Sequence, residues 1–135
     1  MRMQNSTYIS TENVAEMDVK HHAMNLNVAR RLGAESQLRQ TMEECCELAV
    51  AANKLIRVYT KVSTLHDRIE ARNHLIEEMG DVLILIDQMK FLIGMTTTEL
   101  TGTMHWKIER TWQKIRKEKG GIDVDLMSEV RKKAD

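Results

Sequence analysis

The segment that decides the fold reads LRQTMEECCELAVAANKLIRVY and covers residues 38–59. Apolar or small side chains recur in it at alternating steps of four and three residues: Leu38, Met42, Cys45, Ala49, Ala52, Ile56 and Tyr59. This spacing aligns them along one side of an α-helix and is typical of a helical-bundle seam. It predicts a helix over about residues 35–61, which Ser63 and Thr64 end.

A helix is also predicted before this segment, over about residues 11–32. Its apolar stripe consists of Val14, Met17, His21, Met24, Val28 and Leu32. Gly33 follows directly and is a suitable helix stop.

Two more helices are predicted after it. One covers residues 65–93, and the other begins at a capping box of Thr96 and Glu99 and stops before Gly120. The run Val82–Ile86 is apolar on all sides of its helix, which indicates burial on several sides and therefore an oligomer.

Together these helices predict one all-α domain over residues 1–135, a four-helix-type bundle with an antiparallel central hairpin. Its core covers about residues 37–119, and a C-terminal tail covers 122–135.

The composition fits this prediction and narrows the function. The 135 residues include no proline, and 20 basic residues balance 20 acidic ones, so a nucleic-acid or membrane partner is not expected. No apolar run reaches the ~18 residues of a membrane span, and the first residues lack the apolar core of a signal peptide. Cys45 and Cys46 are adjacent on a helix and unsuited to a structural disulfide, so a reducing, cytoplasmic location is expected.

Two pairs of acids carry the candidate chemistry, because each pair is spaced three residues apart and therefore shares one side of a helix. Glu44 and Glu47 form the first pair, and Glu78 and Asp81 form the second. Both pairs lie beside apolar positions: Leu48, Ala51 and Leu55 for the first, and Val82, Leu85 and Met89 for the second. Glu43 and Glu77 are expected to point outward instead.

The two pairs are also predicted to meet. In an antiparallel hairpin, facing residues have position numbers with a constant sum, and Glu44 with Asp81 and Glu47 with Glu78 both add up to 125. The implied turn lies between Val62 and Ser63, where the helical pattern breaks.

Four carboxylates at one level of a bundle repel one another and need a counter-charge. Oxygen ligands of this kind suit Mg²⁺ or Mn²⁺, and such a cation suits phosphate chemistry. Lys54, Lys107 and Arg110, with Lys114, are candidate contacts for substrate phosphates. A single Glu-x-x-Glu is common and usually solvated, so the prediction depends on the matched register of the two pairs.

The acidic strings resemble a known family. Residues 43–49 (EECCELA) and 77–83 (EEMGDVL) are similar to the motifs of MazG-like, all-α nucleoside triphosphate pyrophosphohydrolases, and Lys107-Ile108-Glu109-Arg110 resembles the later basic segment. That superfamily also contains dimeric dUTPases and phosphoribosyl-ATP pyrophosphohydrolases. The spacer between the acidic motifs is somewhat long for the family, and the N-terminal helix has no counterpart in it.

The resemblance implies a homodimer or homotetramer that hydrolyses a nucleoside triphosphate, with non-canonical nucleotides and deoxynucleotides as candidates, to a nucleoside monophosphate and pyrophosphate. It implies that Glu44, Glu47, Glu78 and Asp81 hold Mg²⁺, and that Glu47 is a candidate to orient or deprotonate the attacking water. Two alternatives remain: a non-catalytic helical interaction module, and phosphoribosyl-ATP hydrolysis. A di-iron bundle is disfavoured, because its typical Glu-x-x-His motif does not occur in the sequence.

Overall fold

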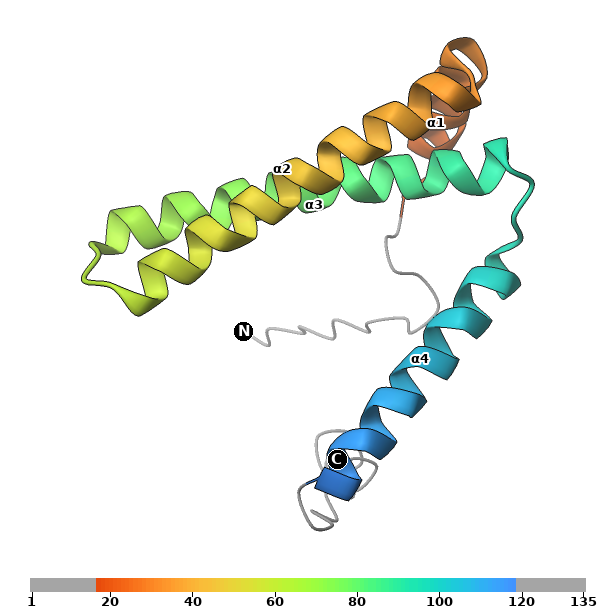
Figure 1. Ribbon diagram of the computed structural model, residues 1–135. Coiled ribbons are helices and arrows are strands. Elements are labelled where there is room, and N and C mark those ends of the chain that lie inside the picture. The colour runs from red at the N-terminus through yellow and green to blue at the C-terminus, as the bar shows by residue number, and fades with distance from the viewer. Residues whose placement is uncertain (1–16, 119–135) are drawn as a thin grey trace, which may run out of the picture. The chain divides into compact units, whose positions relative to one another are not determined.

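A computed structural model describes residues 17–118 of the chain, and all of its secondary structure there is α-helical (Figure 1). The helices are α1 (Val19–Leu32), α2 (Ala34–Thr60), α3 (Leu65–Leu92) and α4 (Thr97–Glu118). The predicted all-α fold class is confirmed. The first helix begins at Val19, so Met17 and Asp18, which the prediction included, are not helical. The earlier part of that predicted helix and the tail at 122–135 lie outside the described residues.

The helix boundaries are set by local chemistry. Asp18 caps α1, and Gly33, with φ +82°, is the single residue between α1 and α2. Thr64 and Asp67 form a reciprocal capping box at the start of α3. The box predicted for Thr96 and Glu99 is present before α4.

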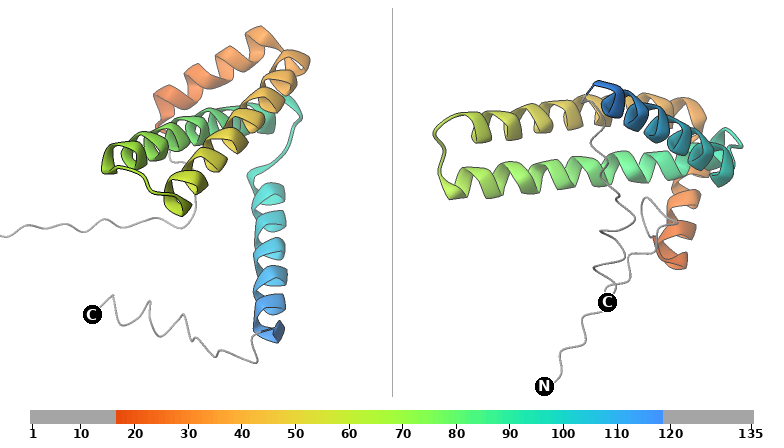
Figure 2. Two further views of the ribbon diagram at one scale, coloured as in Figure 1. Left: turned by 60° about the vertical axis from the view of Figure 1, so that its left-hand side comes forward. Right: turned by 90° about the horizontal axis from the view of Figure 1, so that it is seen from below.

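The described helices fall into two units. The first, which ends at Met95, contains α1, α2 and α3, and the second begins at Thr96 and contains α4. Within the first unit, α2 and α3 run antiparallel side by side, while α1 packs on both of them at the end away from the 61–64 turn (Figure 2). None of the described helices is long and apolar enough to cross a membrane.

The core of the described chain is small. Its buried apolar residues are Ala29, Ala51, Ala71, Leu85 and Met89. Each of the three helices in the first unit contributes at least one alanine, and such short side chains let helices approach closely. In α4, by contrast, no residue is buried.

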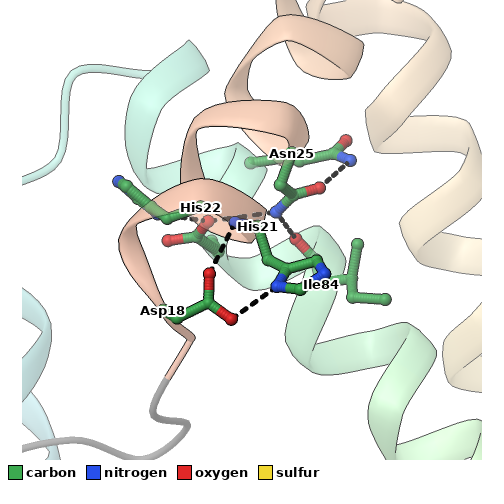
Figure 3. A network of polar contacts seen from close by, with 7 residues as sticks. Asp18, His21, His22, Asn25 and Ile84 are labelled. Atoms are coloured by element: carbon green, nitrogen blue, oxygen red, sulfur yellow. Dashed lines mark hydrogen bonds and ion pairs between the residues drawn. The ribbon is translucent and has the colours of Figure 1, made fainter.

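A chain of side-chain amides joins α1, α2 and α3 inside the first unit. Gln37 of α2 donates a hydrogen bond to Gln88 of α3, which donates in turn to Asn25 of α1 at 2.7 Å. Asn25 then donates to the Ile84 carbonyl and to Asp87, both at 3.0 Å (Figure 3). Asn25, Gln37 and Gln88 are all buried, so each needs these partners.

This network explains why the apolar stripe predicted for the N-terminal helix is not its packed side. Met24, Val28 and Leu32 are each about half exposed, and the buried residues of α1 are Asn25 and Ala29. His21 of the stripe is exposed as well, and contacts Asp18 in its own helix cap (Figure 3). Polar pairing with α3 thus decides which side of α1 is buried.

The seam read from residues 38–59 is also largely exposed within the chain. Met42 is 71% exposed and Tyr59 is 64% exposed, while the side of α2 that meets α3 includes Gln37 and the buried Ala51. Helix α2 therefore has two apolar sides. One is the exposed seam, and the other, which also carries Glu44, packs against α3.

We expect Gln88→Ala to lower the free energy of unfolding by about 2 kcal/mol or more. The substitution leaves a donor of Gln37 and an acceptor of Asn25 buried without their partner, and each loss costs about 1–3 kcal/mol. Urea unfolding measures the change. Asn53→Ala, at an exposed position of α2, is the control and should change stability by less than about 0.5 kcal/mol. Equal effects of the two substitutions would show that the amide network does not hold the helices together.

Candidate metal centre

Three glutamates from two helices converge on one side of the α2–α3 hairpin. One carboxylate oxygen each of Glu44, Glu47 and Glu78 lies within 4.8 Å of the other two. Glu44 and Glu47 are one turn apart on α2, and Glu78 approaches from α3. No other group of this kind occurs among residues 17–118.

The convergence follows from the register of the hairpin. On one side of the cluster Gln37 pairs with Gln88, and on the other Lys54 Nζ lies 2.8 Å from Glu70 Oε1. The position numbers of the first pair add up to 125 and those of the second to 124. The amide pair has the sum predicted from the acidic motifs, and the ion pair lies within one residue of it. Glu47 and Glu78 meet as this register requires.

The predicted orientations are also found. Glu78, Leu85 and Met89 are buried, whereas Glu43 and Glu77 are exposed. Glu44 is half-buried and accepts a hydrogen bond of 2.6 Å from Gln40, one turn earlier on α2. The acids beside the apolar positions thus face the hairpin contact.

Glu78 is the most confined of the three carboxylates. Its side chain is only 7% exposed, and its Oε2 is buried without a hydrogen-bond partner in the described chain. Its Oε1 lies 3.4 Å from His74 Nδ1. A buried carboxylate oxygen without a donor is costly, and here the nearest groups include two more carboxylates. The donor set and the unpartnered oxygen both fit a hard divalent cation.

Glu47 is exposed at the rim of the cluster, and its neighbours alter its protonation. The negative charges of Glu44 and, next in size, Glu78 raise the pKa of Glu47 above its ordinary value of 4.5. The folded protein therefore holds this proton more tightly than the unfolded chain does. The resulting stabilisation is full below pH 4.5 and is lost as the pH rises through the raised pKa. In the absence of a cation, an ionised Glu47 thus opposes folding at neutral pH.

Asp81, predicted as a fourth ligand, lies one turn after Glu78 on α3 and is half-buried. It is not part of the three-residue group. Its role as a ligand stays a prediction.

The basic side chains predicted to contact phosphates are spread more widely along the chain than the acids. The Lys54 ammonium pairs with Glu70 and borders a pocket of about 460 Å³ that is also lined by Asn73, His74 and Glu77. Lys107 and Arg110 lie on exposed positions of α4, in the second unit. The Arg110 guanidinium stacks over the Trp106 ring at 4.6 Å. The role of all three in substrate binding stays a prediction.

Two polar neighbours of the cluster were not identified from the sequence: Gln40, which contacts Glu44, and His74, which contacts Glu78. Both are spaced four residues before their glutamate, so the i,i+4 rule for helix neighbours could have indicated them.

Comparison of the chain with known proteins adds no evidence about this site. No family model matches it, and neither curated proteins nor solved structures give a significant match. The resemblance to MazG-like enzymes therefore stays a prediction from the acidic motifs, and the chemistry of the site has to be argued from its geometry.

We expect Mg²⁺ or Mn²⁺ to raise the thermal midpoint of unfolding and EDTA to lower it. A cation that binds only the folded protein at a hundredfold excess over its Kd adds about 2.7 kcal/mol, which corresponds to roughly 5–10 °C for a domain of this size. Differential scanning fluorimetry measures the shift.

Glu47→Gln is the diagnostic variant for this effect. In EDTA its midpoint should lie above that of the wild type at neutral pH, because one repelling charge is removed. Its response to Mg²⁺ should be reduced, whereas Glu43→Gln should respond like the wild type. A wild-type midpoint that is the same in EDTA and in millimolar Mg²⁺ would argue against a metal centre.

Proposed function

We propose that this protein is a Mg²⁺-dependent nucleoside triphosphate pyrophosphohydrolase, with Mn²⁺ as a possible substitute, in a cytoplasmic setting. The observation that carries the proposal is the convergence of Glu44, Glu47 and Glu78, together with the buried, unpartnered Oε2 of Glu78. Acidic residues that only keep a protein surface soluble do not need to converge in this way. The oxygen ligands of the cluster favour Mg²⁺ or Mn²⁺ over softer metals. The resemblance of the acidic motifs to MazG-like enzymes supports the same reaction.

The proposed reaction assigns different tasks to the three glutamates. Glu44 and Glu78, with Asp81 beside them, would hold the cation, which when bound neutralises phosphate oxygens and makes water more acidic. Glu47 is exposed at the rim of the cluster, so it is the member best placed to accept a proton from the attacking water. Water would add to a phosphorus of the triphosphate and give a proton to Glu47, while the P–O bond between the α- and β-phosphates breaks. The products are a nucleoside monophosphate and pyrophosphate.

Lys107 and Arg110 belong to the second unit, and their contact with the phosphates stays a prediction. Lys54 would supply positive charge to the phosphates from the first unit. For Lys54 this requires an exchange of partners, because its ammonium now pairs with Glu70. Both side chains of this pair are partly exposed, and such pairs contribute little to stability, so the exchange has a low cost.

We expect pyrophosphate release from a panel of nucleoside and deoxynucleoside triphosphates with Mg²⁺, including phosphoribosyl-ATP. Glu47→Gln should reduce the rate at least ~100-fold, because several kcal/mol of transition-state stabilisation depend on the site. Glu43→Gln, one residue away but facing out, should stay within about threefold of the wild type.

Loss of activity in Glu43→Gln as complete as in Glu47→Gln would refute the assigned sides of α2. Absence of pyrophosphate release with every substrate would instead favour the non-catalytic interaction module.

We also propose that the active form is a homodimer or homotetramer. Large apolar side chains along the seam of α2 are exposed, among them Leu38, Met42, Ile56 and Tyr59. In the run Val82–Ile86 only Leu85 is buried, while Ile84 is 41% exposed. Apolar surface of this extent is typical of an interface, and a second copy would cover it.

The proposed interface and the metal centre do not compete for the same side of α2. At about 100° per residue, Met42 and Glu47 point in nearly opposite directions around the helix axis. Assembly through the seam would therefore leave Glu47 accessible to substrate.

We expect the wild-type protein to sediment as a dimer or larger species at micromolar concentration. Met42→Lys should shift it towards the monomer and lower its thermal midpoint, because a charge at the centre of the seam is not paired there. Ser36→Lys adds the same charge on an exposed part of α2 that points away from the seam, and should leave the sedimentation unchanged. A wild-type monomer that is stably folded would contradict the proposal.

A further inference from the structure

His74 lies one helical turn before Glu78 on α3, and its ring borders two different environments. Its Nδ1 is 3.4 Å from Glu78 Oε1. The ring also lines the pocket shared with Lys54 and Asn73. His74 is 39% exposed at its side chain, so it lies between the buried carboxylate and the solvent.

The contact makes the two oxygens of Glu78 unequal. Oε1 has His74 as a neighbour, whereas Oε2 is buried and has no hydrogen-bond partner in the described chain. With a proton on Nδ1, the imidazole would attract Oε1 across this 3.4 Å contact, which would restrain rotation of the carboxylate. Without that restraint, repulsion from Glu44 and Glu47 would favour movement of the Glu78 carboxylate away from them.

Helix α3 contains a second histidine–glutamate pair with the same spacing of four residues. Comparison with it shows what distinguishes the pair of His74 and Glu78. His66 Nε2 lies 4.0 Å from Glu70 Oε2, but these side chains are 86% and 58% exposed. The other oxygen of Glu70 accepts a hydrogen bond from Lys54. Only the pair of His74 and Glu78 therefore combines a buried glutamate with an unpartnered oxygen beside other carboxylates.

We propose that His74 is a positioning residue of the metal centre, which holds Glu78 Oε1 so that Oε2 can bind a divalent cation. This inference rests on the proposed metal site and adds a residue that the acidic motifs do not contain. Carboxylates that ligate metals are commonly fixed by such an outer contact, and its removal typically weakens metal binding 10–100-fold.

The test measures Mn²⁺ binding to the full-length protein, by the loss of the free Mn²⁺ signal in electron paramagnetic resonance. His74→Ala should weaken binding about tenfold or more. His74→Asn should recover most of the affinity, because its amide nitrogen occupies nearly the position of Nδ1 and can donate to Oε1. His66→Ala is the matched control, since it removes the equivalent histidine from the exposed pair, and should bind Mn²⁺ like the wild type.

The outcomes separate this inference from the proposed function. Wild-type protein that binds Mn²⁺, with His74→Ala equally tight, would overturn the role of His74 and leave the metal site standing. The same holds if His74→Asn binds as weakly as His74→Ala while circular dichroism shows both variants folded. Wild-type protein that binds no Mn²⁺ would overturn both the metal site and the role of His74.

Discussion

The antiparallel register of α2 against α3 is the constraint on which the candidate metal centre depends. The buried pair of Gln37 and Gln88 fixes it on one side of the cluster, and the contact of Lys54 with Glu70 on the other side is compatible with it. A slip of one residue would rotate each facing side chain by about 100° around its helix. Glu47 would then no longer face Glu78, and the three carboxylates would separate. The buried amide pair makes such a slip costly, because both amides would lose their partners.

Much of this hairpin could be predicted from the sequence, since its information is local. The break at Ser63 and Thr64 locates the turn, and a short turn leaves few registers for two long helices. The inward orientation of Glu44 and Glu78 follows from their spacing to apolar neighbours such as Ala51 and Leu85. Helical periodicity reports these relations directly, because all of them lie within one helix or across one short connection.

The choice of partner for each apolar side could not be predicted in the same way. Periodicity shows that a side is apolar, but it does not show whether the chain itself or another molecule covers it. The seam through Met42 and Ile56 is a clear bundle pattern, yet it is exposed in the chain. On α1 the packed side was missed, because Asn25 and Ala29 do not stand out by hydrophobicity. Their value lies in amide pairing and close approach, which depend on residues of α3 about 60 positions later.

The three glutamates differ in how deeply they are buried, and this difference suits them to different tasks. Glu78 is buried and has His74 at one oxygen, Glu44 is half-buried and bonded to Gln40, and Glu47 is exposed. The deepest group loses most hydration and gains most from a fixed counter-charge, so it is suited to be a permanent ligand. The outermost group keeps its contact with water while its neighbours raise its pKa. A single register therefore gives three identical side chains different environments, which would suit the deepest to hold a cation and the outermost to exchange a proton.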